Sequence, residues 1–164
     1  MTLRPASHVD HERLLQLNAA SVQELSPLDQ PRLAYILALA HSCLVVESDD
    51  GEVVGFAIAV APGADYDSAN YAWFQQRYER FLYLDRIAVS SASRRQGVGA
   101  QLYDAMEQQA ASFQRMVCDV NIEPANEASL AFHTARGYRE VGRLAHGDVK
   151  TVALMSKELA GAAG

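Results

Sequence analysis

Cysteine is scarce in this chain, and the two cysteines that it has stand far apart. Cys43 and Cys118 both lie inside apolar runs, and neither belongs to a CxxC motif. Small secreted domains held together by disulfides carry several closely spaced cysteines, so this class of protein is excluded. We expect two reduced thiols packed in the interior.

Long hydrophobic runs are missing as well. The N-terminal stretch MTLRPASHVDHERLL lacks the apolar core of a signal peptide. No later run approaches the roughly 20 apolar residues of a membrane-spanning helix. These absences predict a cytoplasmic enzyme or binding domain with no membrane partner.

Positive charge is in deficit. The chain has 14 Lys and Arg against 20 Asp and Glu, a net charge of -6 with a pI near 5.3. Nucleic acids are bound through broad basic surfaces, so we expect no nucleic acid partner. A small basic pocket inside an acidic protein is still compatible with these numbers.

What the chain does have is the size and composition of an ordinary globular domain. Its 164 residues are 49% hydrophobic and 21% charged, enough to bury a substantial core. No internal repeat or linker interrupts it. We therefore expect one domain over residues 1–160, followed by a frayed tail at 161–164.

The beginning of the chain is predicted as a short strand over residues 3–6 and two helices. Ser7 is a candidate N-cap, with Asp10 three residues later, and the apolar face of the first helix extends to Val22. Pro31 suits the first turn of the second helix.

Two β-rich runs, residues 43–48 and 53–61, then predict a hairpin that turns at Asp50-Gly51. The following segment, residues 62–81, has no clear period and is left unassigned; long connections of this kind are often functional. The remaining elements are predicted as strands over 81–89, 116–122, 138–144 and 149–159 and as helices over 98–113 and 127–136.

The stretch RRQGVGA, residues 94–100, stands between a predicted strand and a predicted helix. Glycines let an anion approach the main chain, and the N-terminal end of a helix favours negative charge. A Walker loop is excluded, because Ala100-Gln101 stand where Lys-Ser or Lys-Thr is needed, and a dinucleotide fold needs a third glycine. The pattern favours a pyrophosphate site, and a glycine turn without a ligand is the alternative.

Two motifs carry a resemblance to a known family. The stretch LDRIAVSSASRRQGVGAQL resembles the phosphate-binding motif of the GNAT N-acetyltransferase superfamily, with Arg94, Gly97 and Gly99 at its defining positions. The stretch VNIEPANEASLAFHTARGYREVG resembles the later segment of that family, with Asn126 and Gly137-Tyr138 in the expected order. The resemblance covers nearly the whole chain.

This resemblance implies an α/β (α+β) fold, with a mixed, mostly antiparallel central sheet flanked by about four helices. It also implies direct transfer of an acetyl group from acetyl-CoA to a primary amine of a small molecule, peptide or protein. A non-catalytic acyl-CoA-binding sensor or partner module on the same fold is the alternative. The acceptor is not identified by the motifs.

The resemblance places acetyl-CoA, as a co-substrate, against the glycine turn and the strand before it. The amides of the turn would hold the pyrophosphate beside two arginines, and the strand would pair with the extended pantetheine arm. The histidines show no ligand spacing, so no metal is expected. The residues implied to bind the cofactor are Ile87, Ala88, Val89, Arg94, Arg95, Gln96, Gly97, Val98, Gly99, Ala100, Asn126 and His133.

Asp85 is the candidate general base, because the family often uses an acidic residue on this strand. Strand alternation predicts one face shared by Tyr83, Asp85, Ile87 and Val89. The alternative is that Asp85 pairs with Arg86 or another surface charge. Glu79 and Glu123 are weaker candidates, and Cys118, between apolar neighbours, is expected to be packed rather than nucleophilic.

His133 is the candidate acid. Many family members have Tyr at this position, where the hydroxyl meets the cofactor sulfur, and this chain departs from the pattern. An imidazolium is able to donate to a thiolate, and its unperturbed pKa of about 6.5 suits neutral pH. A merely packed His133 is the alternative, with Tyr103, Tyr138 or solvent serving instead.

The unassigned segment lies where the family varies its substrate contacts. The candidate acceptor-binding residues are Tyr71, Trp73, Phe74 and Tyr83. Asp65 and Asp67 are candidates for attracting a cationic amine. The alternative is that these aromatic side chains cover the core or the partner in a homodimer.

Overall fold

The computed structural model describes residues 1–21 and 25–159 of the chain. Val22 and the tail predicted at 161–164 lie outside the described residues. The α-helices are α1 His11–Ala20, α2 Gln30–Leu39, α3 Ala69–Arg77, α4 Val98–Ala110 and α5 Glu127–Ala135. The strands are β1 Thr2–Pro5, β2 Ser42–Glu47, β3 Val53–Val60, β4 Leu82–Val89, β5 Arg115–Glu123, β6 Arg139–His146 and β7 Lys150–Glu158.

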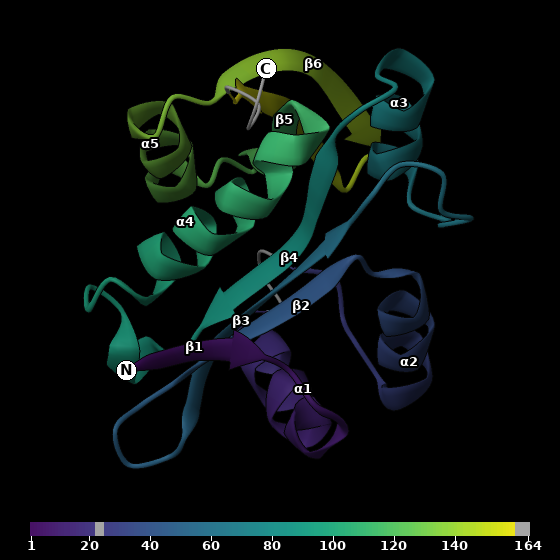
Figure 1. Ribbon diagram of the computed structural model, residues 1–164. Coiled ribbons are helices and arrows are strands. Elements are labelled where there is room, and N and C mark those ends of the chain that lie inside the picture. Colours follow the sequence, from purple (N-terminus) through teal and green to yellow (C-terminus); the bar gives the residue numbers. More distant parts are fainter. Residues whose placement is uncertain (22–24, 160–164) are drawn as a thin grey trace.

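In this described part of the chain, one seven-stranded sheet has the order β1-β2-β3-β4-β5-β7-β6. Every neighbouring pair is antiparallel except β4 and β5, which run parallel. Figure 1 shows α4 and α5 on one side of β4, and α1 and α2 on the other. The mixed, mostly antiparallel sheet expected from the sequence is confirmed.

The predicted local signals are found where helices and turns begin and end. Asp10 accepts from the backbone N–H of Ser7 at 2.8 Å in a capping box. Asn126 caps α5 by accepting from the N–H of Ser129. Gly51 has a positive φ of 86°, which places the hairpin turn where it was predicted.

Two hydrophobic clusters fill the two faces of the sheet. One packs under α1, α2 and α3 and includes Phe56, Tyr71 and Phe74. The other packs under α4 and includes Leu84, Leu102 and Cys118. Every helix in the described ranges is too short or too polar to cross a lipid bilayer.

The parallel strands β4 and β5 pair only where they begin. Leu82 lies opposite Met116, and Tyr83 lies opposite Val117. Beyond these positions β4 continues with β3 and β5 continues with β7, so no further pairing joins β4 to β5 in the described chain. The divergence leaves backbone hydrogen-bonding groups without sheet partners at the centre of the molecule. We call this gap the fork.

A β-bulge in β4 lies at the fork. The register between β3 and β4 shifts there and skips Asp85. Side-chain alternation is therefore interrupted: Leu84 and Ile87 pack toward α4, whereas Tyr83 and Ala88 pack on the opposite face. The predicted common face for Tyr83 and Ile87 is wrong, because the bulge inserts one residue into the alternation.

Much of the unassigned segment is helical. It contains α3, which Ser68 caps by accepting from the N–H of Tyr71. The described ranges thus hold five α-helices, where about four were expected. The indole of Trp73 occupies the space that a Cβ on Gly142 would need, and this contact ties α3 to β6. Tertiary packing rather than an apolar period therefore holds this helix.

Candidate active site

A cavity of about 620 Å³ fills the fork. Its walls come from β4, from the turn before α4, from β5 and from the beginning of α5, with Ser21 and Leu25 at one side. It brings together many of the residues singled out in the sequence. These are Asp85, Ile87, Ala88, Val89, Arg94, Arg95, Gly99, Asn126 and His133.

The glycine turn has the backbone of an anion site. Arg95 and Gly97 both have left-handed φ angles, 68° and 81°. Residues in left-handed conformation next to right-handed ones turn successive N–H groups to one side and form anion-binding concavities. The first turn-closing bond of α4 runs from Gln101 N to Gly97 O at 2.9 Å. In the described structure the amides of residues 98–100 thus have no backbone acceptor.

The two glycines of the turn do different things. Gly97 supplies a left-handed conformation that other residues adopt at a cost. Gly99 has an ordinary conformation, but it lines the cavity, and a Cβ there would meet no atom within 4 Å. Val98 between them is buried in the cluster under α4. The arrangement fits a pyrophosphate group, held by amides and flanked by Arg94 and Arg95.

The strand edge at the fork fits an extended amide chain. Ile87, Ala88 and Val89 line the cavity on the part of β4 that β5 has left. Unpaired strand edges bind extended peptide-like ligands through main-chain hydrogen bonds. Asn126 also lines the cavity, although its side-chain oxygen is engaged in capping α5. Its contact with the cofactor stays a prediction, as do those of Gln96 and Ala100.

Asp85 is buried and held by two donors. The hydroxyl of Tyr66 donates to its Oδ1 at 2.6 Å, and Nε of Arg86 donates to its Oδ2 at 3.1 Å. Arg86 is fixed in turn by Asn18 of α1, at 2.9 Å. The pairing with Arg86 that the sequence left as an alternative is present, and Asp85 also lines the cavity. Its role as general base stays a prediction.

The sequence reading missed a second carboxylate at the fork. Asp119 lines the cavity from β5 and accepts from the hydroxyl of Tyr83 at 2.6 Å. Burial raises the pKa of Asp119, and the hydroxyl of Tyr83 opposes that effect. An acidic residue inside the apolar run MVCDVNI was the available signal. Carboxylates are rare in buried strands unless they have a partner or a function, and Asp119 lines the cavity at the fork.

His133 is buried and both of its ring nitrogens are engaged. Nδ1 lies 2.7 Å from the carbonyl oxygen of Ser129, so Nδ1 carries the proton. Nε2 then accepts from the hydroxyl of Tyr103 at 2.5 Å. Burial lowers the pKa of His133 below its usual value, so the ring is neutral at pH 7. A directly donating imidazolium, as expected from the sequence, is therefore disfavoured.

Tyr103 enters the site from α4. It lines the cavity beside His133, and burial raises the pKa of its hydroxyl well above the ordinary value. Cys118, on the same wall, is buried as expected, and burial raises its thiol pKa in the same way. At neutral pH the described residues therefore place a protonated phenol and an unreactive thiol here.

The predicted acceptor-binding residues lie elsewhere in the described structure. Tyr71, Phe74 and Tyr83 are core side chains, and Trp73 packs on β6. None of them lines the cavity, and their contact with an acceptor stays a prediction. The predicted amine-attracting residues also lie outside the cavity lining; Asp67 pairs with Arg32. Burial favours the alternative that these aromatic side chains serve packing.

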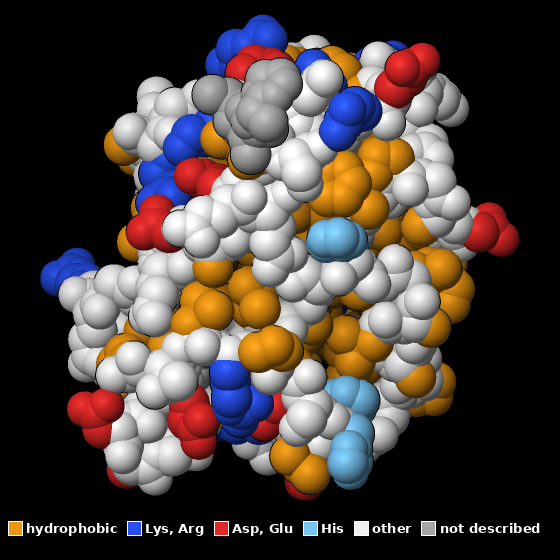
Figure 2. Space-filling model, in the orientation of Figure 1, with side chains coloured by type: hydrophobic (Ala, Val, Ile, Leu, Met, Phe, Trp, Pro, Cys, Tyr) orange, Lys and Arg blue, Asp and Glu red, His pale blue; other side chains and the backbone are white. Residues whose placement is uncertain are grey.

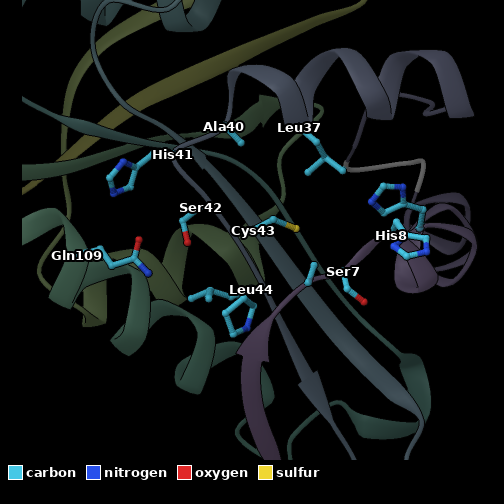
Figure 3. Close-up of a pocket in the computed structure, with 12 residues that line it drawn as sticks. Ser7, His8, Leu37, Ala40, His41, Ser42, Cys43, Leu44 and Gln109 are labelled. Carbon is cyan, nitrogen blue, oxygen red and sulfur yellow. The ribbon is translucent and has the colours of Figure 1, made fainter.

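A second hollow of about 500 Å³ lies over β2, between β1, the end of α2 and α4 (Figure 3). His41, Ser42 and Gln109 gather at one side of it and His8 at the other. On the face shown in Figure 2, histidine side chains lie among hydrophobic ones. No group of three or more His, Cys, Asp or Glu suited to a metal occurs in the described ranges. None of the predicted site residues lies in this hollow.

Comparison with known proteins agrees with this geometry. The model of the acetyltransferase (GNAT) family matches residues 11–138. No curated protein matches the chain. The Escherichia coli ribosomal-protein-S18-alanine N-acetyltransferase has a similar structure, with a TM-score of 0.73 at 16% identity, covering 99% of this chain and 96% of that enzyme.

Two further solved structures have comparable TM-scores and sequence identities. Naa20 from Chaetomium thermophilum, solved with a bisubstrate analogue, gives a TM-score of 0.76 at 18% identity and covers 97% of this chain and 87% of its own. A phosphinothricin acetyltransferase from Sinorhizobium meliloti, solved with acetyl-CoA, gives 0.70 at 21% identity, covering 99% and 91%.

The expected fold, the enzyme class and acetyl-CoA as co-substrate are confirmed together. The family model starts at the first helix and covers the first motif that carried the resemblance and the second as far as Tyr138. The chain belongs to the acetyltransferase (GNAT) family, the acetyl-CoA-dependent N-acetyltransferases that its motifs predicted.

Proposed function

We propose that the protein acetylates a primary amine that reaches the fork from the side of α1 and α3. The observation that carries this proposal is the pair of carboxylates, Asp85 and Asp119, in the cavity between the diverging strands. A primary amine is a cation at neutral pH, and buried carboxylates attract it. Arg86 compensates part of this charge, and the remainder favours an ammonium group.

Acetyl-CoA, when bound, supplies the thioester whose acetyl group is transferred. We propose that the amides of residues 96–100, with Arg94 and Arg95, bind its pyrophosphate. Ile87, Ala88 and Val89 then bind the extended arm through their main chain. These assignments rest on the amides of residues 98–100, which have no backbone acceptor in the described structure, and on the unpaired edge of β4; the amide of Gln96 donates to the carbonyl oxygen of Ser93.

We propose that the Tyr103 hydroxyl stabilises the departing thiolate by turning its one O–H from Nε2 of His133 toward the sulfur, and that His133 holds the hydroxyl at the cavity wall until then. The phenol is protonated at neutral pH, and it lies on the cavity wall that α4 and α5 form. His133 then acts through Tyr103 rather than as the donor itself, because its Nε2 is an acceptor in this arrangement. Hydrogen bonds to a developing anion strengthen as its charge grows.

The proposal is tested with a panel of amines. Thiol release from acetyl-CoA is measured with small primary amines, free amino acids and short peptides, against tertiary amines as negative controls. Acetylation of at least one primary amine with product confirmed by mass spectrometry is expected. Asp85→Asn should raise the KM for the amine several-fold, because it removes one of two attracting charges. Slow hydrolysis of acetyl-CoA with no acetylated amine would contradict the proposal.

We also propose a cytoplasmic setting and a single domain over residues 1–160, with neither nucleic acid nor a membrane as partner. The net charge of -6 supports the exclusion of nucleic acid. A homodimer stays a prediction, to be checked by light scattering of the purified chain.

A further inference from the structure

Asp119 stands where β4 and β5 part. The last residue of β5 that pairs with β4 is Val117, and Asp119 follows two positions later on the same face. Val117 and Tyr83 pack on the side of the sheet that α1 and α3 cover. Asp119 therefore faces the side from which the amine is proposed to enter, and the opposite wall carries Tyr103.

The two carboxylates of the fork differ in what compensates their charge. Asp85 accepts from a fixed cation, Arg86, as well as from a hydroxyl. Asp119 accepts from the neutral hydroxyl of Tyr83, and no ion pair to Asp119 occurs among the residues that the structure describes. Asp85 is thus paired with a cation, whereas Asp119 is held by a neutral hydroxyl, and burial raises the pKa of Asp119.

The side chain of Asn70, on α3, lies near Asp119. Asn70 is buried, and its amide lies near enough to Asp119 to lower the pKa of that carboxyl. Its Oδ1 lies 2.9 Å from Nε2 of His146, at the end of β6. Because a protonated ring nitrogen donates to that oxygen, the amide NH₂ is left to face Asp119. The hydrogen bond from His146 therefore fixes which way Asn70 points.

We propose, on the basis of the proposed function, that Asp119 accepts the proton of the acceptor ammonium and that Asn70, oriented by His146, is its positioning residue. One N–H bond of the ammonium breaks, and the proton forms an O–H bond on Asp119. The freed electron pair of nitrogen then forms the bond to the acetyl carbon, while the carbon–sulfur bond breaks. The second proton of nitrogen ends on the sulfur, and Asp119 returns its own proton to water.

The groups around Asp119 act on its proton affinity in known directions. Burial raises the pKa of Asp119, and the negative charge of Asp85 on β4 raises it further. The hydroxyl of Tyr83, the amide of Asn70 and the charge of Lys150 on β7 lower it. A base is active when deprotonated, so kcat/KM should rise with pH through the pKa of Asp119.

The test is the pH profile of kcat/KM, measured with two amine acceptors of different pKa. If the pH at which kcat/KM rises on the acid side of the profile (the acid limb) is the same for both amines, the titrating group belongs to the enzyme. Asp119→Asn should remove this limb and lower kcat/KM at pH 7 by about a hundredfold, with recovery at alkaline pH where the amine loses its proton unaided. Asp49→Asn, at an exposed aspartate of the β2–β3 hairpin outside the cavity lining, is the matched control and should leave the profile unchanged.

Substitutions of residues around Asp119 test its assignment as the base while Asp119 itself is kept. Tyr83→Phe and Asn70→Ala each remove a donor, so the acid limb should move to higher pH; His146→Ala should do the same more weakly. Asp85→Asn removes a negative charge and should move the limb to lower pH. In an Asp119→Asn background none of these four should shift the profile.

The outcomes separate this inference from the proposed function. An active wild type whose acid limb survives in Asp119→Asn, with the variant's melting temperature retained, overturns the inference alone. Shifts by Asn70→Ala that persist without Asp119 also overturn it. A wild type that binds CoA but acetylates no amine contradicts the proposed function itself.

Discussion

At the scale of single residues, the chemistry of the site depends on which side chains donate and which accept hydrogen bonds. His133 occupies the position where the family pattern has tyrosine, yet its protonated Nδ1 faces a carbonyl oxygen and its Nε2 faces Tyr103. A hydroxyl is thus still present in the cavity, and it comes from α4 rather than α5. The sequence left Tyr103 as one of several alternatives to His133, and the structure places its hydroxyl against the ring.

Tyr103→Phe should lower the single-turnover rate of acetyl transfer about tenfold to a hundredfold, because a proton donor to the leaving sulfur is lost. His133→Phe should cost less, since it removes only the orientation of that donor. CoA affinity, measured by calorimetry, should change little in both variants. A large loss in His133→Phe with none in Tyr103→Phe would instead restore histidine as the direct acid.

The pH dependence of stability tests the state of His133. Burial lowers the pKa of this ring in the folded protein, so below about pH 6.5 the unfolded chain takes up a proton that the folded chain does not. Its contribution to stability is therefore present at neutral pH and lost as pH falls. The melting temperature of His133→Gln should decline less between pH 7 and pH 5 than that of the wild type. Equal declines would show that the ring titrates normally.

The two glycines of the turn should respond differently to a side chain. Gly97→Ala should destabilise the fold by about 1 kcal/mol, because its φ of 81° is left-handed. Gly99→Val should melt close to wild type but bind CoA weakly, since its side chain would point into open cavity. Thermal melts and calorimetric titration of CoA check both. Unchanged CoA affinity in Gly99→Val would mean that the ligand does not approach this backbone.

At the scale of elements, the contact between α3 and β6 holds α3 against the sheet. The indole of Trp73 contacts Gly142, and the guanidinium carbon of Arg77 lies 3.8 Å from the centre of the indole ring. This contact positions the helix that carries Asn70. Two polar side chains of the segment 62–81 reach the site residues: Tyr66 donates to Asp85, and Asn70 lies near Asp119.

Gly142→Ala should destabilise the protein by about 1–3 kcal/mol, since its Cβ overlaps the indole. In a Trp73→Leu background the same substitution should cost clearly less, because the overlap is gone. Chemical denaturation of the four proteins of this cycle measures the coupling. Additive effects would show that the two residues do not touch in solution.

At the scale of the whole molecule, the sheet is opened at its centre rather than closed. Strands β4 and β5 pair at one end and part toward the other, and the cavity in the gap has walls from both halves of the chain. A ligand that fills this gap contacts both halves at once. It should therefore stabilise the fold as a unit.

CoA at a hundred times its Kd should raise the free energy of unfolding by about 2.7 kcal/mol, because it binds only the folded state. For a chain of this size that corresponds to a rise in melting temperature of roughly 5–10 °C. ATP and NAD at the same concentration should protect much less. Melting temperatures are measured by scanning fluorimetry. Equal protection by all three ligands would contradict specific binding of CoA.

The sequence alone determined most of the helices and strands, the caps at Ser7 and Asn126, the glycine turn and the family. These features depend on neighbours in the chain: a capping side chain, a left-handed glycine or an apolar period acts over a few residues. It also indicated Asp85 and His133 as residues of the site, and the cavity contains both.

Tertiary structure decided the rest. The bulge at Asp85 depends on the register against β3, and it reversed the expected alternation of β4. The proximity of Asp119, Tyr83 and Asn70 depends on where β4, β5 and α3 meet, and the hydrogen bond between Tyr103 and His133 depends on how α4 packs on α5. These hydrogen bonds join residues 30 or more positions apart, and the pattern of any one segment carries no information about the segment packed against it.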